Sequence, residues 1–170
     1  MLWSRLLCWI AAAGFASACP AQEMASAREA QLKAAYVFNF IKFVDWDARS
    51  TGSVVDVCFN GADEVREALE LASTDKLVGI RQIRVHTLKP TAANDDCEVT
   101  YADATQPAST HLPTSALSVG DAPAFTQSGG IIRLYTESNR LRFVINVGNA
   151  RKAGLQISSN LLKLASEVEQ

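Results

Sequence analysis

The longest periodic stretch of apolar residues lies between Ala27 and Asp45 and predicts an amphipathic helix. At about 100° per residue, its apolar side chains recur every three or four positions and gather on one face. We expect that face to hold Leu32, Tyr36, Phe40 and Phe43, widened by Val37, Ile41 and Val44. Phe38 falls among the polar residues of the opposite face, and Trp46 lies just beyond the helix. The pattern therefore predicts a core helix, with Phe38 and Trp46 as candidate contacts for another molecule.

Shorter apolar runs further along the chain predict strands separated by turns. We expect strands at 54–59, 80–88, 97–102, 117–120, 131–135 and 141–147, and helices at 63–72 and 160–167. The last two strands have the pattern of a hairpin. Because strands and helices alternate early and the chain finishes with a hairpin and helices, the expected class is α/β. The expected architecture is a three-layer sandwich with a mixed, mostly parallel central sheet, a C-terminal β-hairpin and a terminal helix.

Residues 1–21 have the composition of a secretory signal peptide. Arg5 supplies a positive charge, and the apolar run of ten residues that begins at Leu6 is too short to span a bilayer. Ala16-Ser17-Ala18 has the small residues of a cleavage site. Cys19 follows directly, so lipidation there is an alternative, although Ala16 stands where a lipoprotein signal usually has leucine. We therefore expect export, followed by folding of residues 22–170 as a single domain.

Charge and cysteine content narrow the function classes. Without Arg5 the chain carries 15 basic and 18 acidic residues, a net charge of −3. That mild negative charge argues against nucleic acid or an anionic membrane as a partner.

Cys58 and Cys97 are the only cysteines outside the signal region. In an oxidising compartment they would form one disulfide worth about 4 kcal/mol; the alternative is two separate buried thiols.

Residues suited to catalysis or metal binding are scarce. His86 and His111 each lack a second ligand at metal-binding spacing, so we expect no metal site. Gly129 and Gly130 form no phosphate-binding motif and are typical of a tight turn or a close backbone approach. We expect no catalytic residues and no cofactor.

A ligand would be expected beyond the carboxyl ends of the parallel strands, as in other open α/β sheets. The residues predicted at that edge are Asn60, Gly61, Asp121, Gly129 and Gly130. The alternative is that these residues only make turns.

An ordered set of motifs covers most of the chain after the signal region. The motifs are EAQLKAAYVFNFIKFVDW (29–46), VDVCFNG (55–61), GIRQIRV (79–85), CEV (97–99), LSVGDAPAF (117–125), GGIIRL (129–134) and RLRFVINVGNARKAGLQISSNLLKLA (140–165). With these motifs the chain resembles the YfiR family, small exported α/β proteins. The most specific match is the C-terminal motif, and the aromatic helix ending at Trp46 is next.

The resemblance implies a periplasmic regulator without catalytic activity. It implies binding and repression of the periplasmic domain of an inner-membrane diguanylate cyclase, and thereby control of cyclic di-GMP and biofilm formation. It also implies sequestration by an OmpA-like outer-membrane lipoprotein, and a homodimer is a further expected assembly. The family disulfide corresponds to Cys58 and Cys97, whereas a second cysteine pair of some relatives is absent here. The alternative function is a periplasmic small-molecule-binding sensor module that feeds a membrane receptor or kinase.

Overall fold

The structure, a computed structural model, describes residues 20–46, 52–88, 97–106 and 113–170. Most of the predicted signal peptide, Cys19 and His111 therefore lie outside the described residues. The helices are α1 (Pro20–Phe43), α2 (Asp63–Ser73), α3 (Val147–Lys152) and α4 (Ser159–Leu162). The longer strands are β2 (Val54–Asn60), β4 (Arg81–Thr87), β5 (Val99–Ala102), β6 (Leu117–Gly120), β7 (Ile132–Glu137) and β8 (Arg140–Asn146). The short strands are β1 (Val44–Asp45), β3 (Leu77–Val78), β9 (Gln156–Ile157) and β10 (Glu167–Glu169).

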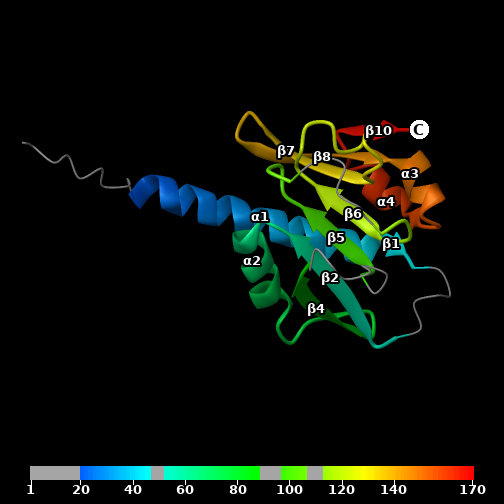
Figure 1. Cartoon of the computed structure of the whole chain (residues 1–170), viewed down its shortest axis with the longest axis horizontal. Helices are drawn as coiled ribbons and strands as arrows, with labels where there is room; N and C mark the ends of the chain where they lie inside the picture. Colours follow the sequence, from blue (N-terminus) through cyan, green and yellow to red (C-terminus); the bar gives the residue numbers. More distant parts are fainter. Residues whose placement is uncertain (1–19, 47–51, 89–96, 107–112) are drawn as a thin grey trace, which may run out of the picture.

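Eight of the strands form one mixed sheet in the order β10-β8-β7-β6-β5-β2-β4-β3 (Figure 1). Only the β3–β4 and β7–β8 pairs of this sheet are antiparallel, and the others are parallel. The predicted α/β class with a mixed, mostly parallel sheet and a C-terminal hairpin is confirmed. The two-residue strands β1 and β9 pair separately and join the end of α1 to the segment after α3.

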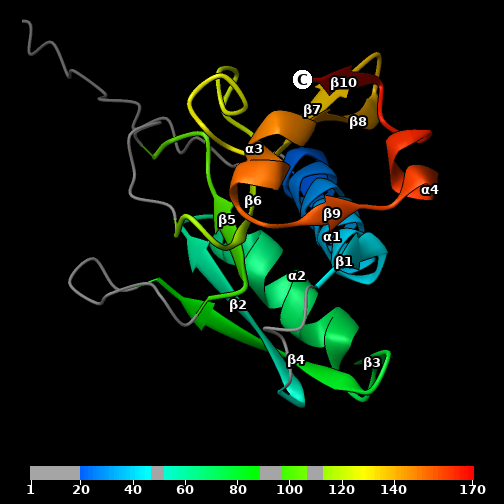
Figure 2. The same cartoon turned by 90° about the vertical axis from the view of Figure 1, so that its right-hand side faces the viewer.

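The sheet curls about α1, with α2 beside this helix, as Figure 2 shows in a view close to the helix axis. Strand alternation explains the contact, because successive side chains point to opposite faces of a sheet. Leu141 and Phe143 of β8 are buried on the face towards α1, where the Phe143 ring lies 5.1 Å from the Phe40 ring. On neighbouring strands, Phe59 and Tyr101 stack with ring centroids 5.2 Å apart. The core is thus one apolar cluster between α1, α2 and the sheet.

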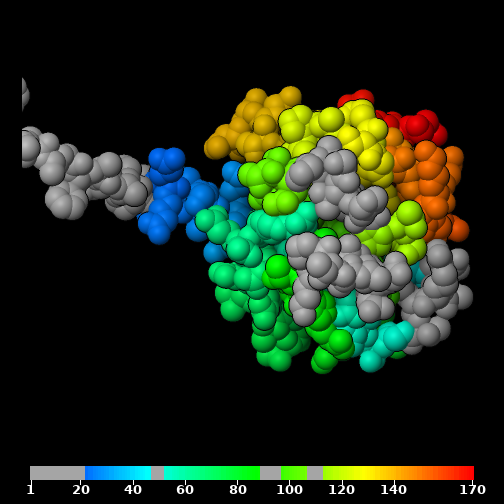
Figure 3. Space-filling view, in the orientation of Figure 1, coloured from blue at the N-terminus to red at the C-terminus, as the bar shows by residue number. Residues whose placement is uncertain are grey.

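Helix α1 begins earlier than the helix predicted at 27–45, and fewer of its residues are buried than expected. Residues 22–29 are all exposed, and the first turns of α1 project from the body of the molecule (Figures 1 and 3). Ala30 is the first buried residue of α1. The prediction that Leu32 belongs to the core is wrong, because its side chain is 45% exposed. The helix meets the sheet only from about Ala30 onwards, and there the small residues Ala30 and Ala34 make the contact.

The helix predicted at 160–167 is reduced to the single turn of α4, and the chain ends as strand β10 instead. The Ser158 side chain caps α4 by accepting a hydrogen bond from the Leu161 amide. The Ser166 amide then donates to the carbonyl of Phe143, and β10 continues that pairing in parallel with β8. Tertiary pairing with the sheet therefore overrides the helical pattern of this segment.

A disulfide joins Cys58 and Cys97, with the two Cα atoms 5.9 Å apart. Cys58 lies in β2, and Cys97 stands two residues before β5, the neighbouring strand. Of the two alternatives left open by the sequence, the structure contains the cross-link. It links the segment before β5 covalently to β2.

Gly120 and Gly130 make room for the ring of Phe125. A Cβ atom on Gly130 would lie 2.3 Å from one edge of this ring, and a Cβ on Gly120 would lie 2.6 Å from the other edge. Phe125 is only 4% exposed, so its ring is held between the two glycines. The close-approach interpretation of Gly130 is confirmed, while Gly129 adopts a positive φ of 99° in the adjacent turn.

Gly130→Ala is therefore expected to destabilise the protein by about 1–3 kcal/mol, the usual cost of overpacking a core. The ring cannot move aside, because Gly120 closes its opposite edge. Urea denaturation would measure the loss, with Gly52→Ala as the matched control, since a Cβ there meets nothing closer than 3.8 Å. Shrinking the ring with Phe125→Leu should recover part of the loss in the double variant. Equal stability of Gly130→Ala and wild type would contradict the packing described.

Candidate functional site

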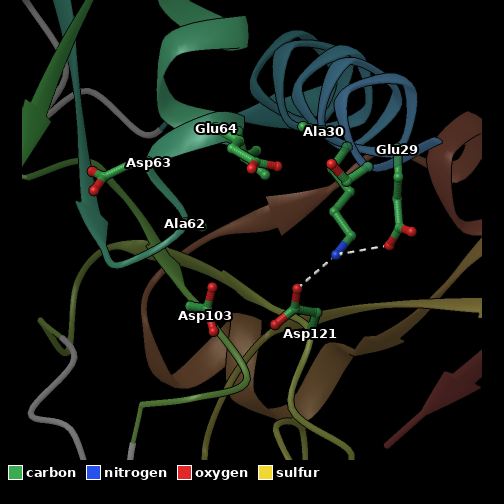
Figure 4. Close-up of a pocket in the computed structure, with 10 residues that line it drawn as sticks. Glu29, Ala30, Ala62, Asp63, Glu64, Asp103 and Asp121 are labelled. Atoms are coloured by element: carbon green, nitrogen blue, oxygen red, sulfur yellow. Dashed lines mark hydrogen bonds and ion pairs between the residues drawn. The ribbon is translucent and has the colours of Figure 1, made fainter. Parts of the chain in front are cut away.

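A cavity of about 480 Å³ opens beyond the carboxyl ends of β2, β5 and β6 (Figure 4). One wall comes from the N-terminal half of α1, and the other from the start of α2. Asp103, directly after β5, and Asp121, directly after β6, complete the lining. The lining residues are Ser26, Glu29, Ala30, Lys33, Ala62, Asp63, Glu64, Val65, Asp103 and Asp121.

The topology of the sheet explains why a hollow forms at this edge. From β2 the chain passes through α2 to β4 on one side, and it later returns to β5 on the other side of β2. The connections after β2 and β5 therefore leave the sheet in opposite directions, which opens a crevice between them. Ligands of open α/β sheets bind at such a switch point. A volume of about 480 Å³ also lies within the range of small-molecule pockets.

A lysine and two carboxylates of the lining are paired with one another. The Lys33 ammonium lies 2.8 Å from Asp121 Oδ2 and 3.1 Å from Glu29 Oε1 (Figure 4). The hydroxyl of Tyr101, which is fully buried, donates to the same Asp121 oxygen at 3.2 Å. Asp121 thus ties α1 to the carboxyl end of the sheet across 88 positions of sequence.

The surroundings shift the pKa values of two of these groups. Burial by itself lowers the pKa of Lys33, but the hydrogen bonds and charges of Asp121 and Glu29 outweigh it, and the net shift is upwards. Burial, reinforced by the negative charge of Asp121, raises the pKa of Tyr101 well above its ordinary value. Both groups therefore hold their protons more tightly in the folded chain than in the unfolded one.

These shifts predict a loss of stability in alkali. A group with a raised folded pKa contributes stability that is complete below its unfolded pKa and is lost as the pH rises towards the folded value. The free energy of unfolding should therefore fall above about pH 10, by up to about 1.4 kcal/mol per pH unit for each group. Urea denaturation between pH 8 and pH 11 would measure the slope. Tyr101→Phe should reduce the slope, and an unchanged slope in that variant would contradict the assignment.

The lining as a whole is acidic, with five carboxylates against the single ammonium of Lys33. Asp63 at the start of α2 pairs with Arg66 at 3.3 Å, and Asp103 Oδ1 accepts a hydrogen bond from the Thr105 amide. Such a lining favours a positively charged group over an anion. Within the described ranges, no group of three or more histidine, cysteine or acidic side chains could hold a metal ion.

The structure brings together some of the predicted binding residues at this edge. Asp121 lines the cavity directly, and the Asn60 carbonyl accepts a hydrogen bond from the Asp103 amide. Gly61 has a φ of +76°, and a Cβ there would lie 3.0 Å from Cβ of Asp103, so glycine permits the close approach. Gly129 and Gly130 lie outside the lining.

The two aromatic candidates on and after α1 lie elsewhere. Phe38 is half-buried against the core, with the ammonium groups of Lys42 and Lys76 6.0 and 5.9 Å from its ring centre. Trp46 is also half-buried, and its indole nitrogen donates to the Ile41 carbonyl at 3.0 Å. Neither residue lines the cavity. For both, a role in binding a partner remains a prediction.

Sequence reasoning missed Glu29, Lys33 and Asp103. Glu29 and Lys33 are spaced four residues apart on a helix, which signals an ion pair but not a cavity. Asp103 follows a predicted strand directly, as Asp121 does, and that shared position could have identified it.

Comparison with known proteins identifies the family of this chain. The family model described as YfiR/HmsC-like matches residues 30–166. The chain belongs to the YfiR/HmsC-like family. The matched range includes most of the cavity lining, but not the exposed first turns of α1. A search of curated proteins gives no match.

Two solved structures show the same fold at low sequence identity. A conserved domain protein from Vibrio cholerae O1 biovar eltor aligns with a TM-score of 0.53 and 13% identity. An ABC domain from Streptococcus pneumonia, solved in complex with L-Trp, aligns with a TM-score of 0.50 and 12% identity. Each alignment covers 82% of this chain but 60% of the other, so this YfiR/HmsC-like chain matches less than two thirds of either structure. At these identities the similarity shows a shared fold and nothing about function.

Proposed function

We propose that the protein is a periplasmic, non-catalytic regulator that binds and represses an inner-membrane diguanylate cyclase. Its action would lower cyclic di-GMP and restrain biofilm formation. The observation that carries this proposal is the family match over residues 30–166. The coarser role, periplasmic regulation in cyclic di-GMP signalling, is the one that membership of the YfiR/HmsC-like family supports most directly.

Two features of the chain support an exported protein. Residues 1–21 have the pattern of a signal peptide, and the disulfide between Cys58 and Cys97 suits an oxidising compartment. In the described part of the chain, no helix combines the length and apolarity that crossing a bilayer requires. We place the working protein in the periplasm, with the periplasmic domain of the cyclase as its partner. An OmpA-like outer-membrane lipoprotein as a second partner and a homodimer belong to the same proposal.

A clean deletion of the gene tests this function. Deletion is expected to raise cellular cyclic di-GMP and surface attachment, because the cyclase would lose its repressor. Deleting the cyclase as well should abolish both effects, which separates repression from an indirect response. Unchanged cyclic di-GMP after deletion, in a strain that carries the cyclase, would contradict the proposal.

A direct complex is expected between the purified protein and the periplasmic domain of that cyclase. A stable, specific complex should bury about 1,200 Å² or more in total. Size-exclusion chromatography with light scattering would detect the complex, and omission of either component provides the control.

The cavity favours a second candidate, a small-molecule-binding sensor module that feeds a membrane receptor or kinase. Its volume and its place at the switch point support this alternative. A thermal-shift screen of small metabolites would test it, since a ligand at 100 times its dissociation constant adds about 2.7 kcal/mol of stability. Asp121→Asn should abolish the shift if the ligand binds there, whereas Gln82→Glu, at an exposed position of β4, should retain it.

A further inference from the structure

A second, smaller hollow lies beside β8. It has a volume of about 230 Å³, and we refer to it as the β8 notch. Its lining residues are Tyr36, Arg140, Leu141, Arg142, Phe143, Leu164, Ala165 and Ser166. None of these residues belongs to the acidic cavity, so the notch is a separate feature of the surface.

The notch exists because β10 covers only part of the edge of β8. Strand β10 pairs with Val144–Asn146, so the stretch Arg140–Phe143 has no strand on that side in the described part of the chain. Side chains from elsewhere satisfy two of its carbonyl groups instead. The Tyr36 hydroxyl donates to the Leu141 carbonyl at 3.3 Å, and the Ser166 hydroxyl donates to the Phe143 carbonyl at 2.7 Å. Over these four residues the edge of β8 is therefore covered by single side chains and not by a strand.

Apolar side chains form part of the notch lining, and one of them is exposed. Leu141 and Phe143 are buried, and the Tyr36 ring packs edge-on against Phe143 with 5.8 Å between centroids. Leu164 is 68% exposed, although it stands next to these apolar groups. A volume of about 230 Å³ is below the usual range for whole small molecules, and it suits one large apolar side chain of a partner.

The charge of the notch lining is opposite to that of the acidic cavity. Two arginines, Arg140 and Arg142, are among the lining residues, and the lining contains no carboxylate. Glu137 on the neighbouring strand pairs with Arg142 at 2.9 Å, which leaves the Arg140 charge as the stronger attraction for an incoming anion. An apolar side chain followed by a carboxylate would therefore meet complementary groups.

We propose that the β8 notch is a docking site for an extended, acidic segment of a partner protein, with one aromatic side chain of that segment seated between Tyr36 and Leu164. A neighbouring carboxylate of the segment pairs with Arg140. The inference rests on the proposed function in one respect, because it takes the partner to be the signalling protein that this chain regulates. The notch would then be the surface by which this chain holds its partner.

The test is a titration of the isotope-labelled full domain with the acetylated, amidated peptide Ser-Glu-Phe-Asp-Glu, followed by NMR. Amide shifts are expected to gather at Tyr36, Arg140–Phe143 and Leu164–Ser166. Leu164→Ser and Arg140→Glu should each weaken binding by about fivefold, the factor expected for one contact of about 1 kcal/mol. The matched controls are Leu71→Ser, which is 78% exposed on α2, and Arg28→Glu, which is exposed on α1. Both controls should bind like wild type.

Three results would overturn the proposal. The first is equal binding of the basic peptide Ser-Lys-Phe-Lys-Lys, and the second is a set of shifts that lies away from the notch. The third is concentration-dependent shifts at the notch without peptide, which would identify a second copy of the chain as its occupant. The titration needs no cyclase, so its failure leaves the cyclic di-GMP experiments to decide the proposed function separately.

Discussion

Phe40→Ala is expected to lower the free energy of unfolding by about 3–5 kcal/mol, the usual cost of removing a buried aromatic side chain. Phe40 is 1% exposed and is among the largest fully buried side chains of the described chain. Its ring lies 5.9 Å from that of Tyr36 and 5.1 Å from that of Phe143, so it joins α1 to β8. Alanine would leave a cavity that rigid neighbours on both elements could not fill.

Leu32→Ala is the matched control, because it removes a large apolar side chain from the same helix. Leu32 is 45% exposed, so its loss should change stability by no more than about 0.5 kcal/mol. Chemical denaturation of both variants and of wild type would give the two differences. A loss at Leu32 as large as that at Phe40 would contradict the orientation of α1 on the sheet.

Removal of the disulfide is the second large effect. The double variant Cys58→Ser/Cys97→Ser is expected to be less stable by about 4 kcal/mol, because the cross-link closes a loop with a sequence separation of 39 residues. In the chain-entropy account most of this loss arises in the unfolded state, which gains freedom when the loop opens. For a domain of this size the midpoint of thermal unfolding should fall by roughly 8–16 °C.

Reduced wild type provides the control for the disulfide prediction. Denaturation of wild type in the presence of a strong reductant should give a stability close to that of the double variant. The reductant should leave the double variant itself unchanged. Two free thiols in unreduced material, detected by alkylation under denaturing conditions, would refute the disulfide.

The amphipathic pattern predicted the buried residues of α1 well from Val37 onwards, and poorly before it. Val37, Phe40, Ile41 and Val44 are buried as expected, because each faces the curled sheet or its neighbours. The stripe continues to Leu32 in sequence, but Leu32 lies on the side of the helix opposite Ala30 and Ala34, which make the contact with the sheet. Periodicity gives the face of a helix, whereas tertiary packing decides how much of that face is covered.

The sequence predicted the site residues that follow strands, but not the contacts between residues far apart in the chain. Asp121 was identified because it follows a short apolar strand, and residues at that position meet at one edge of a parallel sheet. Lys33 lies 88 residues earlier, and its contact with Asp121 depends on where α1 crosses the sheet. Local sequence carries no signal for such a contact. The same limit applies to β10, whose pairing with β8 depends on a surface formed by distant residues.

We propose that this chain acts after export and represses cyclic di-GMP synthesis. Cellular cyclic di-GMP, measured in a deletion strain that expresses either the full chain or residues 22–170 without the signal region, tests it most directly. We predict that the full chain restores the low wild-type level and that the cytosolic form, at equal abundance, leaves the level high. Equal restoration by both forms, or by neither, would contradict the account.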